Sequence, residues 1–516
     1  MKKIINSEYL YHLLIFIFFL IATLILASYI GFNRHWSSVF DHELTLAYNA
    51  LLYNNGIQHE YLAHPAYFTI LFLSFFLKIL NILNIIEVYK LSLITLNNFD
   101  QSLQEIIFYT RLYSSICVSI FCSLIYFSFW RFTGNKSYSF LLSLLALTSI
   151  GTIFHITQLR SELMSMFFFT LSFLSLKIFL ENEKKNKIIY LIGFFLFLYC
   201  SLLSKMQIFF YIPLLFVIFY FTKVNIKSFD FREFTFLNRK IIPYLFSFIV
   251  LFYIYLVNKS LHPFPIFSAV VVILNILIIN IIFYLILKKN NIETYNNLIT
   301  FNLLLISVFF ILKTFLSIHP STAPEMFSNL TRIINLRMYI SSDLSLIVES
   351  NSEFTYVIIK TFFINFSTLL KEFLLTVNLY GLLIIINVTL CILYRKRFNK
   401  ELILFNLSCV FVSIAILTIS SFRNNGFFVD HYLIYSDFFL ILSFCSFSKF
   451  LKLRYLSLLV IFISLINFND NLDLIKKQKN IFENKSKLCN NTYFYDWHKK
   501  IEKNYLLKFC KNPPLY

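Results

Sequence analysis

The stretch YHLLIFIFFLIATLILASYIG, residues Tyr11 to Gly31, decides the fold class of this chain. It is an unbroken apolar run, and a helix of about 20 such residues is long enough to cross a bilayer. Lys2 and Lys3 precede it, as in a signal peptide, but no small-residue cleavage site follows it. We therefore expect an uncleaved first membrane span.

Comparable apolar runs recur along the 516 residues, of which 58% are hydrophobic and only 14% are charged. A soluble domain with so few charges could not keep its surface hydrated. The sequence predicts an all-α polytopic membrane protein with about 13 transmembrane helices, each read from one apolar run. The expected spans lie near 11–32, 109–130, 138–154, 163–180, 188–203, 207–222, 241–257, 264–287, 298–318, 375–394, 402–421, 431–448 and 454–468.

The basic residues predict the orientation of these spans, because cytoplasmic loops are enriched in Lys and Arg. Alternate loops are strongly basic if the amino terminus is inside, whereas the opposite short loops hold only Arg160, Lys205, Lys259 and Arg423. Residues 1–468 then form one transmembrane domain. Its first extracytoplasmic loop is 33–108, its second large one is 319–374, and the tail 469–516 is also outside.

This alternation requires that the apolar stretch 66–86 does not cross the membrane. Lys78 lies in its middle, and Asn81 and Asn84 follow. A helix that lies in the membrane interface tolerates these residues better than a span that faces lipid.

Composition also excludes other classes. The net charge of +19 suggests nucleic-acid binding, but the basic residues lie in short loops between apolar runs, so we expect no nucleic-acid partner. Gly is scarce, with 7 residues, which disfavours a transporter built on close helix crossings.

Six cysteines lie in apolar runs, while Cys489 and Cys510 lie in the tail. A disulfide between these two is plausible in an oxidising compartment.

The first outside loop carries the most chemistry. Asp41 and Glu43 follow the first span closely, in Phe40-Asp41-His42-Glu43. In an extended chain both carboxylates point the same way, and in a helix they diverge. A carboxylate here can act as a general base on a hydroxyl or bind a divalent ion. The alternative is a solvated loop with two chance acids.

Other polar residues fall on the same predicted face. His64 precedes Pro65 at the start of the interfacial stretch, where it either opens a helix or faces an anionic headgroup. Arg160 either anchors a turn at the interface or binds a phosphate. The remaining candidates, each with a structural alternative, are Glu162 beside Arg160, Lys205 after the fifth span, and His431 with Tyr432 at the twelfth.

In this order, the residues resemble the GT-C superfamily of glycosyltransferases, which includes protein O-mannosyltransferases and bacterial aminoarabinose transferases. The resemblance covers about the first 220 residues, and Ala66 stands where the family usually has Gly or Pro after its His-Pro step. The residues that carry it are Asp41, Tyr48, Gly56, His64-Pro65, Arg111, the turn Leu159-Arg160-Ser161-Glu162, and Ser204-Lys205.

The resemblance implies a GT-C-like bundle with juxtamembrane helices in the first extracytoplasmic loop, in a bacterial inner membrane, with its site facing outside. It implies an inverting transferase that moves a sugar from a polyprenyl-phosphate carrier to a glycan, lipid or protein acceptor. Asp41 would be the base, and Glu43 would assist it or bind a divalent metal, with no obligatory metal or other cofactor expected. Arg160, Lys205 and His64 would bind the donor phosphate, and Glu162, His431 and Tyr432 would bind substrate.

Three alternatives remain open at this point. A lipid-linked polysaccharide polymerase or ligase also has large outside loops and basic residues, but it does not need an acid directly after the first span. A transporter or flippase would show repeated halves or Gly/Pro-broken spans with polar residues near the midplane, and the sequence indicates neither. A GT-C-like scaffold without activity is the third, because fold does not guarantee function.

Overall fold

The structure is a computed structural model of the full chain, and it describes only part of it. The described residues are 2–39, 43–57, 60, 66–181, 187–205, 367, 379–394, 403, 405–407, 409–414, 432–448, 451–481 and 498–511. The expected spans from 207 to 318 and the loop 319–374 lie outside these residues.

The described part of the chain is helical and contains no strand. Two short 3-10 helices, η1 (Trp36–Val39) and η3 (Leu91–Leu93), accompany the α-helices. In chain order these are α1 (Lys2–Ile30), α2 (Thr45–Asn54), α3 (Tyr67–Ile82), α4 (Phe99–Thr133), α5 (Lys136–Thr148), α6 (Ile150–Ile156), α7 (Ser161–Glu181), α8 (Lys187–Ser204), α16 (Leu379–Leu393), α18 (Leu433–Phe447), α19 (Leu453–Ile481) and α22 (Lys503–Lys511).

Several of these helices are apolar enough to cross a membrane. Within the described residues, Leu10–Ile30, Phe99–Thr133 and Ser161–Ile178 meet the length and hydropathy required, and α5 with α6 forms a bent fourth candidate. The apolar parts of α16, α18 and α19 are shorter. The all-helical membrane fold expected from the sequence is therefore supported, while the number of about 13 spans stays a prediction.

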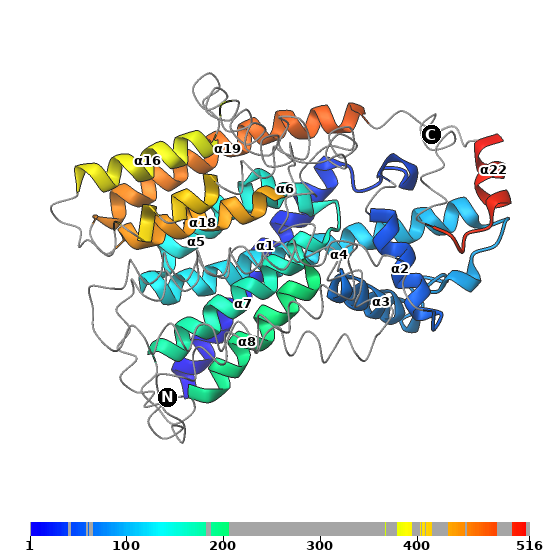
Figure 1. The fold of residues 1–516 in the computed structure, drawn as a ribbon, viewed down its shortest axis with the longest axis horizontal. Coiled ribbons are helices and arrows are strands. Elements are labelled where there is room, and N and C mark those ends of the chain that lie inside the picture. Colours follow the sequence, from blue (N-terminus) through cyan, green and yellow to red (C-terminus); the bar gives the residue numbers. More distant parts are fainter. Residues whose placement is uncertain are drawn as a thin grey trace, which may run out of the picture.

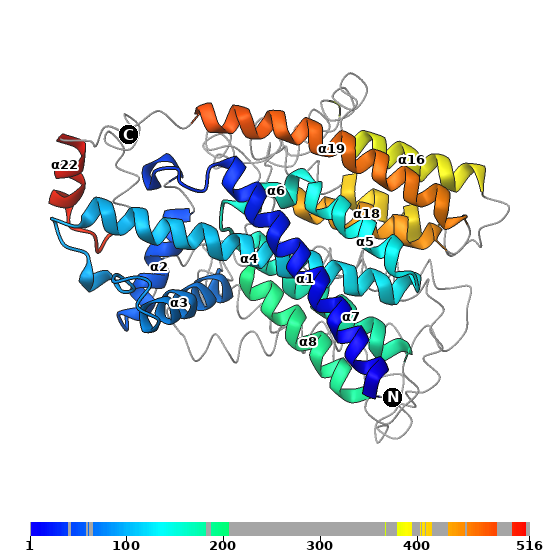
Figure 2. The same ribbon diagram turned by 180° about the vertical axis from the view of Figure 1, so that it is seen from behind.

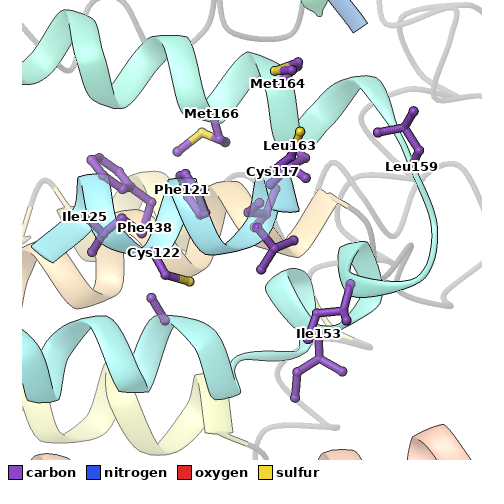
Figure 3. Packing of buried hydrophobic residues seen from close by; sticks show 14 of the residues in the cluster. Cys117, Phe121, Cys122, Ile125, Ile153, Leu159, Leu163, Met164, Met166 and Phe438 are labelled. Carbon is purple, nitrogen blue, oxygen red and sulfur yellow. The ribbon is translucent and has the colours of Figure 1, made fainter. Parts of the chain in front are cut away.

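Helix α4 is the centre around which the described helices pack. Helices α1, α5 and α7 lie against it, α8 lies against α7, and α18 packs on α4, α5 and α6. Figures 1 and 2 show this bundle from its two sides, with α16, α18 and α19 grouped together. In the core, side chains of α4 such as Phe121 meet Leu163 and Met166 of α7 and Phe438 of α18 (Figure 3).

Helix α4 is also longer than the expected span 109–130, because it begins ten residues earlier. Its first turns contain Asp100, Gln104 and Glu105, which are too polar for a hydropathy window. At 1.5 Å per residue the helix is about 50 Å long, so it exceeds the hydrocarbon layer of about 30 Å. Helix η1 and helix α2 of the first loop pack against α4.

The positions of Arg111 and Trp130 indicate how α4 is placed in the membrane. Arg111 is buried about 18 Å from the start of the helix, and Trp130 lies about 28 Å further along it. Beside Trp130, the ammonium group of Lys136 lies 5.0 Å from the centre of that ring and 5.2 Å from that of Tyr11. Amphipathic rings with basic residues are typical of a membrane interface. We infer that Arg111 lies near the opposite interface.

Helix α3 occupies the stretch 66–86, for which the sequence predicts an interfacial helix. It has 16 residues and does not meet the length required of a span. One face packs on α2, α4 and α8, whereas Phe75, Ile79 and Ile82 are more than half exposed. Lys78 is exposed on the same side. This apolar face with one cation suits a lipid surface.

The tail returns to the first loop. The main-chain N–H of Lys500 donates to the hydroxyl of Tyr48 at 2.9 Å, and that hydroxyl donates to Glu60 at 2.8 Å. The ring of Phe509, in α22, lies 5.1 Å from that of Trp36. The tail and the loop therefore lie at one end of the molecule, opposite the amino terminus (Figure 1).

The tail also contains a disulfide. Cys510 is disulfide-bonded, while the six cysteines in the apolar helices are free and buried. The remaining cysteine of the chain, Cys489, lies outside the described residues. A disulfide at Cys510 is compatible with the expected location of the tail outside the cytoplasm.

One expected span differs from its prediction. The sequence predicts a single span over 138–154, but the structure divides it into α5 and α6, which meet at an angle of 67°. Ser149 lies at the break in an extended conformation, and its hydroxyl donates to the carbonyl of Ala146 at 2.7 Å. Serine readily makes such local bonds to the main chain, which compete with continuous helix.

Single-cysteine labelling tests the orientation. We expect a membrane-impermeant maleimide to label Asn33→Cys and Lys499→Cys in intact cells, because both positions are exposed at the end that holds the first loop and the tail. Ser137→Cys, exposed in the first turn of α5 just after the other end of α4, is expected to react only after permeabilisation. The chain without an added cysteine supplies the background. Labelling of Ser137→Cys but not Asn33→Cys in intact cells would contradict this orientation.

Candidate functional site

A buried ion pair joins the first loop to α4. Arg111 donates from Nε to Oε1 of Glu43 and from Nη2 to Oε2, both at 3.1 Å. The exposed fraction of the two side chains is 0% and 1%. Arg111 also donates from Nη1 to the carbonyl oxygens of Phe32, at 3.1 Å, and Arg34. One guanidinium therefore holds the end of α1, the loop and α4 together.

The carboxylate of Glu43 is buried among positive charges. Burial raises the pKa of its carboxyl above the ordinary value, and the positive charges of Arg111, Arg34 and Arg160 oppose that rise. Glu43 was predicted as a catalytic residue, and the structure gives its carboxylate a guanidinium partner. Asp41, predicted as the base, lies outside the described residues.

Arg34 is a site residue that the sequence analysis did not single out. Its Nη2 donates to the hydroxyl of Thr157 at 3.3 Å, and its Nε donates to the carbonyl of Gly31 at 3.1 Å. Burial, and then the neighbouring Arg111, lower the pKa of Arg34 to about 10. Gly31 has a φ of +113° and would bring a Cβ to 3.0 Å from the Arg34 side chain. In the sequence, Gly31 directly after the first span, in a chain with few glycines, was the signal that could have indicated this site.

Arg34 and Arg111 lie beside the turn of residues 157–162, which carries two predicted site residues. Helix α6 ends just before this turn, and α4 holds that end: Ser114 donates to the carbonyl of His155 at 2.6 Å and Ser115 to that of Ile156 at 2.7 Å. In the turn, Arg160 lies 5.4 Å from the ring of Phe154. It is close enough to Glu43 to affect the pKa of that carboxyl.

Two further predicted residues, Lys205 and Tyr432, come together with Glu162 at the same turn. The ammonium group of Lys205 lies 2.7 Å from Oε1 of Glu162, and the two side chains are almost fully buried. The same ammonium group lies 5.4 Å from the ring of Tyr432. These residues come from the start of α7, the end of α8 and the residue before α18, so three separate segments meet there.

Four cations of the described residues gather around this turn. We define the cation cluster as Arg34, Arg111, Arg160 and Lys205; Arg111 pairs with Glu43, Lys205 pairs with Glu162, and Arg34 and Arg160 lie near Glu43. Fixed cations in a largely buried place can bind an anionic ligand, and phosphate groups suit arginine in particular.

Other parts of the prediction are not placed. His64 and His431 lie outside the described residues, as does Asp41. No group of three His, Cys, Asp or Glu side chains in the described segments could hold a metal ion.

The Glu43–Arg111 pair predicts a large effect on stability. Glu43→Gln leaves a buried guanidinium without its counter-charge, and breaking such a pair costs about 3–5 kcal/mol. We expect a matching loss in the free energy of unfolding in detergent, partly recovered by Glu43→Leu with Arg111→Met. Glu87→Gln, an exposed carboxylate in the same loop, is the control and should change stability by less than about 0.5 kcal/mol. Equal stability of Glu43→Gln and the control would contradict this role.

Comparison of the chain with protein-family models, with curated proteins and with solved structures gave no match.

Proposed function

We propose that this protein is a membrane glycosyltransferase that moves a sugar from a polyprenyl-phosphate carrier to an acceptor hydroxyl outside the cytoplasm, with inversion. The observation that carries the proposal is the cation cluster at the end of the bundle that holds the first loop. Negative charge grows on the carrier phosphate as the sugar leaves. Fixed cations in a partly dry site stabilise that charge more in the transition state than in the ground state.

Arg160 and Lys205 are the proposed partners of the phosphate. Arg160 lies on a short turn, where its planar guanidinium can bind two phosphate oxygens at once. Lys205 supplies a compact charge, and Glu162 holds its ammonium group at 2.7 Å. In this scheme Glu162 and Tyr432 orient Lys205, which refines the substrate-binding role that the sequence suggests for them.

Asp41 is the proposed general base. It precedes Glu43 by two residues, and two residues of chain span at most about 7 Å. Glu43 is fixed on Arg111, so the described residue that follows the proposed base by two positions belongs to the cluster. The attacking hydroxyl would give its proton to Asp41 as its oxygen bonds to the anomeric carbon, and the carrier phosphate would leave from the opposite face.

The rest of the donor would bind in the membrane. The exposed face of α3, with Phe75, Ile79 and Ile82, is apolar enough to lie against the isoprenoid tail or the surrounding lipid. Binding of the remote tail would position the sugar carbon against the acceptor. The acceptor is a glycan, a lipid or a protein, the membrane is the bacterial inner membrane, and no metal is obligatory.

A transfer assay tests the proposal. The purified protein in liposomes would be given polyprenyl-phosphate-linked hexoses and pentoses with a cell-envelope extract as acceptor, and released polyprenyl phosphate would be measured. Loss of the base is expected to lower kcat about 10²–10⁴-fold in Asp41→Asn. Loss of one phosphate-stabilising cation, in Arg160→Gln or Lys205→Gln, is expected to cost about 10²–10³-fold.

Two exposed residues supply the controls. Glu87→Gln and Lys452→Gln change one charge each outside the cluster and the α3 face, and should leave kcat unchanged. Movement of a solute or an intact sugar-lipid across the liposome, without release of polyprenyl phosphate, would contradict a transferase and favour a transporter or flippase. Full activity of Asp41→Asn would remove the proposed base.

A further inference from the structure

Asp437 is a buried carboxylate that the sequence analysis left without a role. It lies in α18, with only 3% of its surface exposed, five residues after Tyr432. That separation places it about 7 Å deeper in the bundle than Tyr432. A carboxylate inside a membrane bundle is costly, and such residues are usually kept for a specific task.

The contact of Asp437 lies at the break between α5 and α6. The main-chain N–H of Gly151 donates to Oδ2 of Asp437 at 3.2 Å. A Cβ on Gly151 would lie 2.6 Å from that same oxygen and 2.6 Å from the Cα of Ile434. Any other residue would therefore push α6 away from α18. The glycine and the carboxylate together let the two helices touch at the bend.

The other end of α6 leads directly to the cation cluster. This helix has only seven residues, and the hydroxyl groups of Ser114 and Ser115 hold its last carbonyls. Thr157, which accepts from Arg34, is the next residue, and Arg160 follows three residues later. A shift at the start of so short and buried a helix is passed to its end, because packed interiors leave little room to absorb it.

We propose that Asp437 is a positioning residue: by holding Gly151 it fixes the bend between α5 and α6, and through α6 it places Thr157 against Arg34 and Glu162 against Lys205. The role of the cluster in phosphate binding rests on the proposed function, but the positioning does not. Asp437 itself does not touch the substrate. Its effect on transfer would be indirect, through the place of the turn.

A cysteine reporter in the turn tests this without any substrate. Gln158 is 4% exposed, so Gln158→Cys should react slowly with a maleimide in the purified full-length protein. Asp437→Asn keeps an acceptor oxygen for Gly151 and should leave that rate within about twofold. Asp437→Leu removes the acceptor, and the loss of one buried hydrogen bond should raise the rate about tenfold. Ser436→Ala, a buried change on the same helix, is the matched control.

Gly151→Ala disturbs the same contact between Gly151 and Asp437, and it should also raise the labelling rate of the Gln158→Cys reporter. If Asp437→Leu fails to give a folded protein, Gly151→Ala carries the comparison, and failure of both to fold would assign these residues to folding and contradict the proposal. An unchanged rate in folded Asp437→Leu would overturn it, as would a rate in Asp437→Asn as high as that in Asp437→Leu.

Transfer measurements separate this inference from the proposed function. Where transfer occurs, Asp437→Leu should raise KM for the sugar-lipid about tenfold, the penalty of one displaced hydrogen-bonded contact, with Asp437→Asn near wild type. If the wild type transfers no sugar but the labelling pattern holds, the proposed function fails and the positioning stands. If transfer occurs and the labelling pattern is absent, the positioning role of Asp437 fails and the proposed function stands.

Discussion

The buried ion pair between Glu43 and Arg111 is the interaction on which the functional end of the molecule depends. A charged side chain at the edge of a membrane is costly unless it is paired, so each partner fixes the other. Because Arg111 also binds the carbonyls that follow α1, the pair determines where the first loop leaves the membrane. The proposed base lies on that loop, so the proposed chemistry depends on a contact that takes no direct part in it.

Charge balance connects this pair to the cation cluster. Among the described residues, Glu43 pairs with Arg111 and Glu162 pairs with Lys205, and Arg34 and Arg160 lie near Glu43. In the proposed function these cations bind the carrier phosphate, and the apolar face of α3 lies against lipid. The tail segment with Cys510 covers the same end, which links the carboxyl terminus to the stability of the first loop.

Among the described residues, hydropathy predicted the position of several helices. The expected spans at 163–180 and 188–203 match helices α7 and α8 within two residues, and the sequence also indicates Lys205, Glu162 and Tyr432 as candidate site residues. Their pairing could not be predicted, because it joins three segments far apart in the chain. The early start of α4 was missed because its first turns are polar, and the bend at Ser149 because apolar residues continue across it. The roles of Arg34 and Asp437 could not be predicted, because they depend on contacts with Thr157 and Gly151, which lie far away in the sequence.

The central claim is that the end of the bundle near Arg160 binds a lipid phosphate. Native mass spectrometry of the purified protein with polyprenyl phosphate and with the uncharged polyprenol of equal length tests it most directly. The account predicts that the phosphate is retained, that the alcohol is not, and that the difference shrinks when Arg160 or Lys205 loses its charge. Equal retention of the two lipids by the wild-type protein would contradict it.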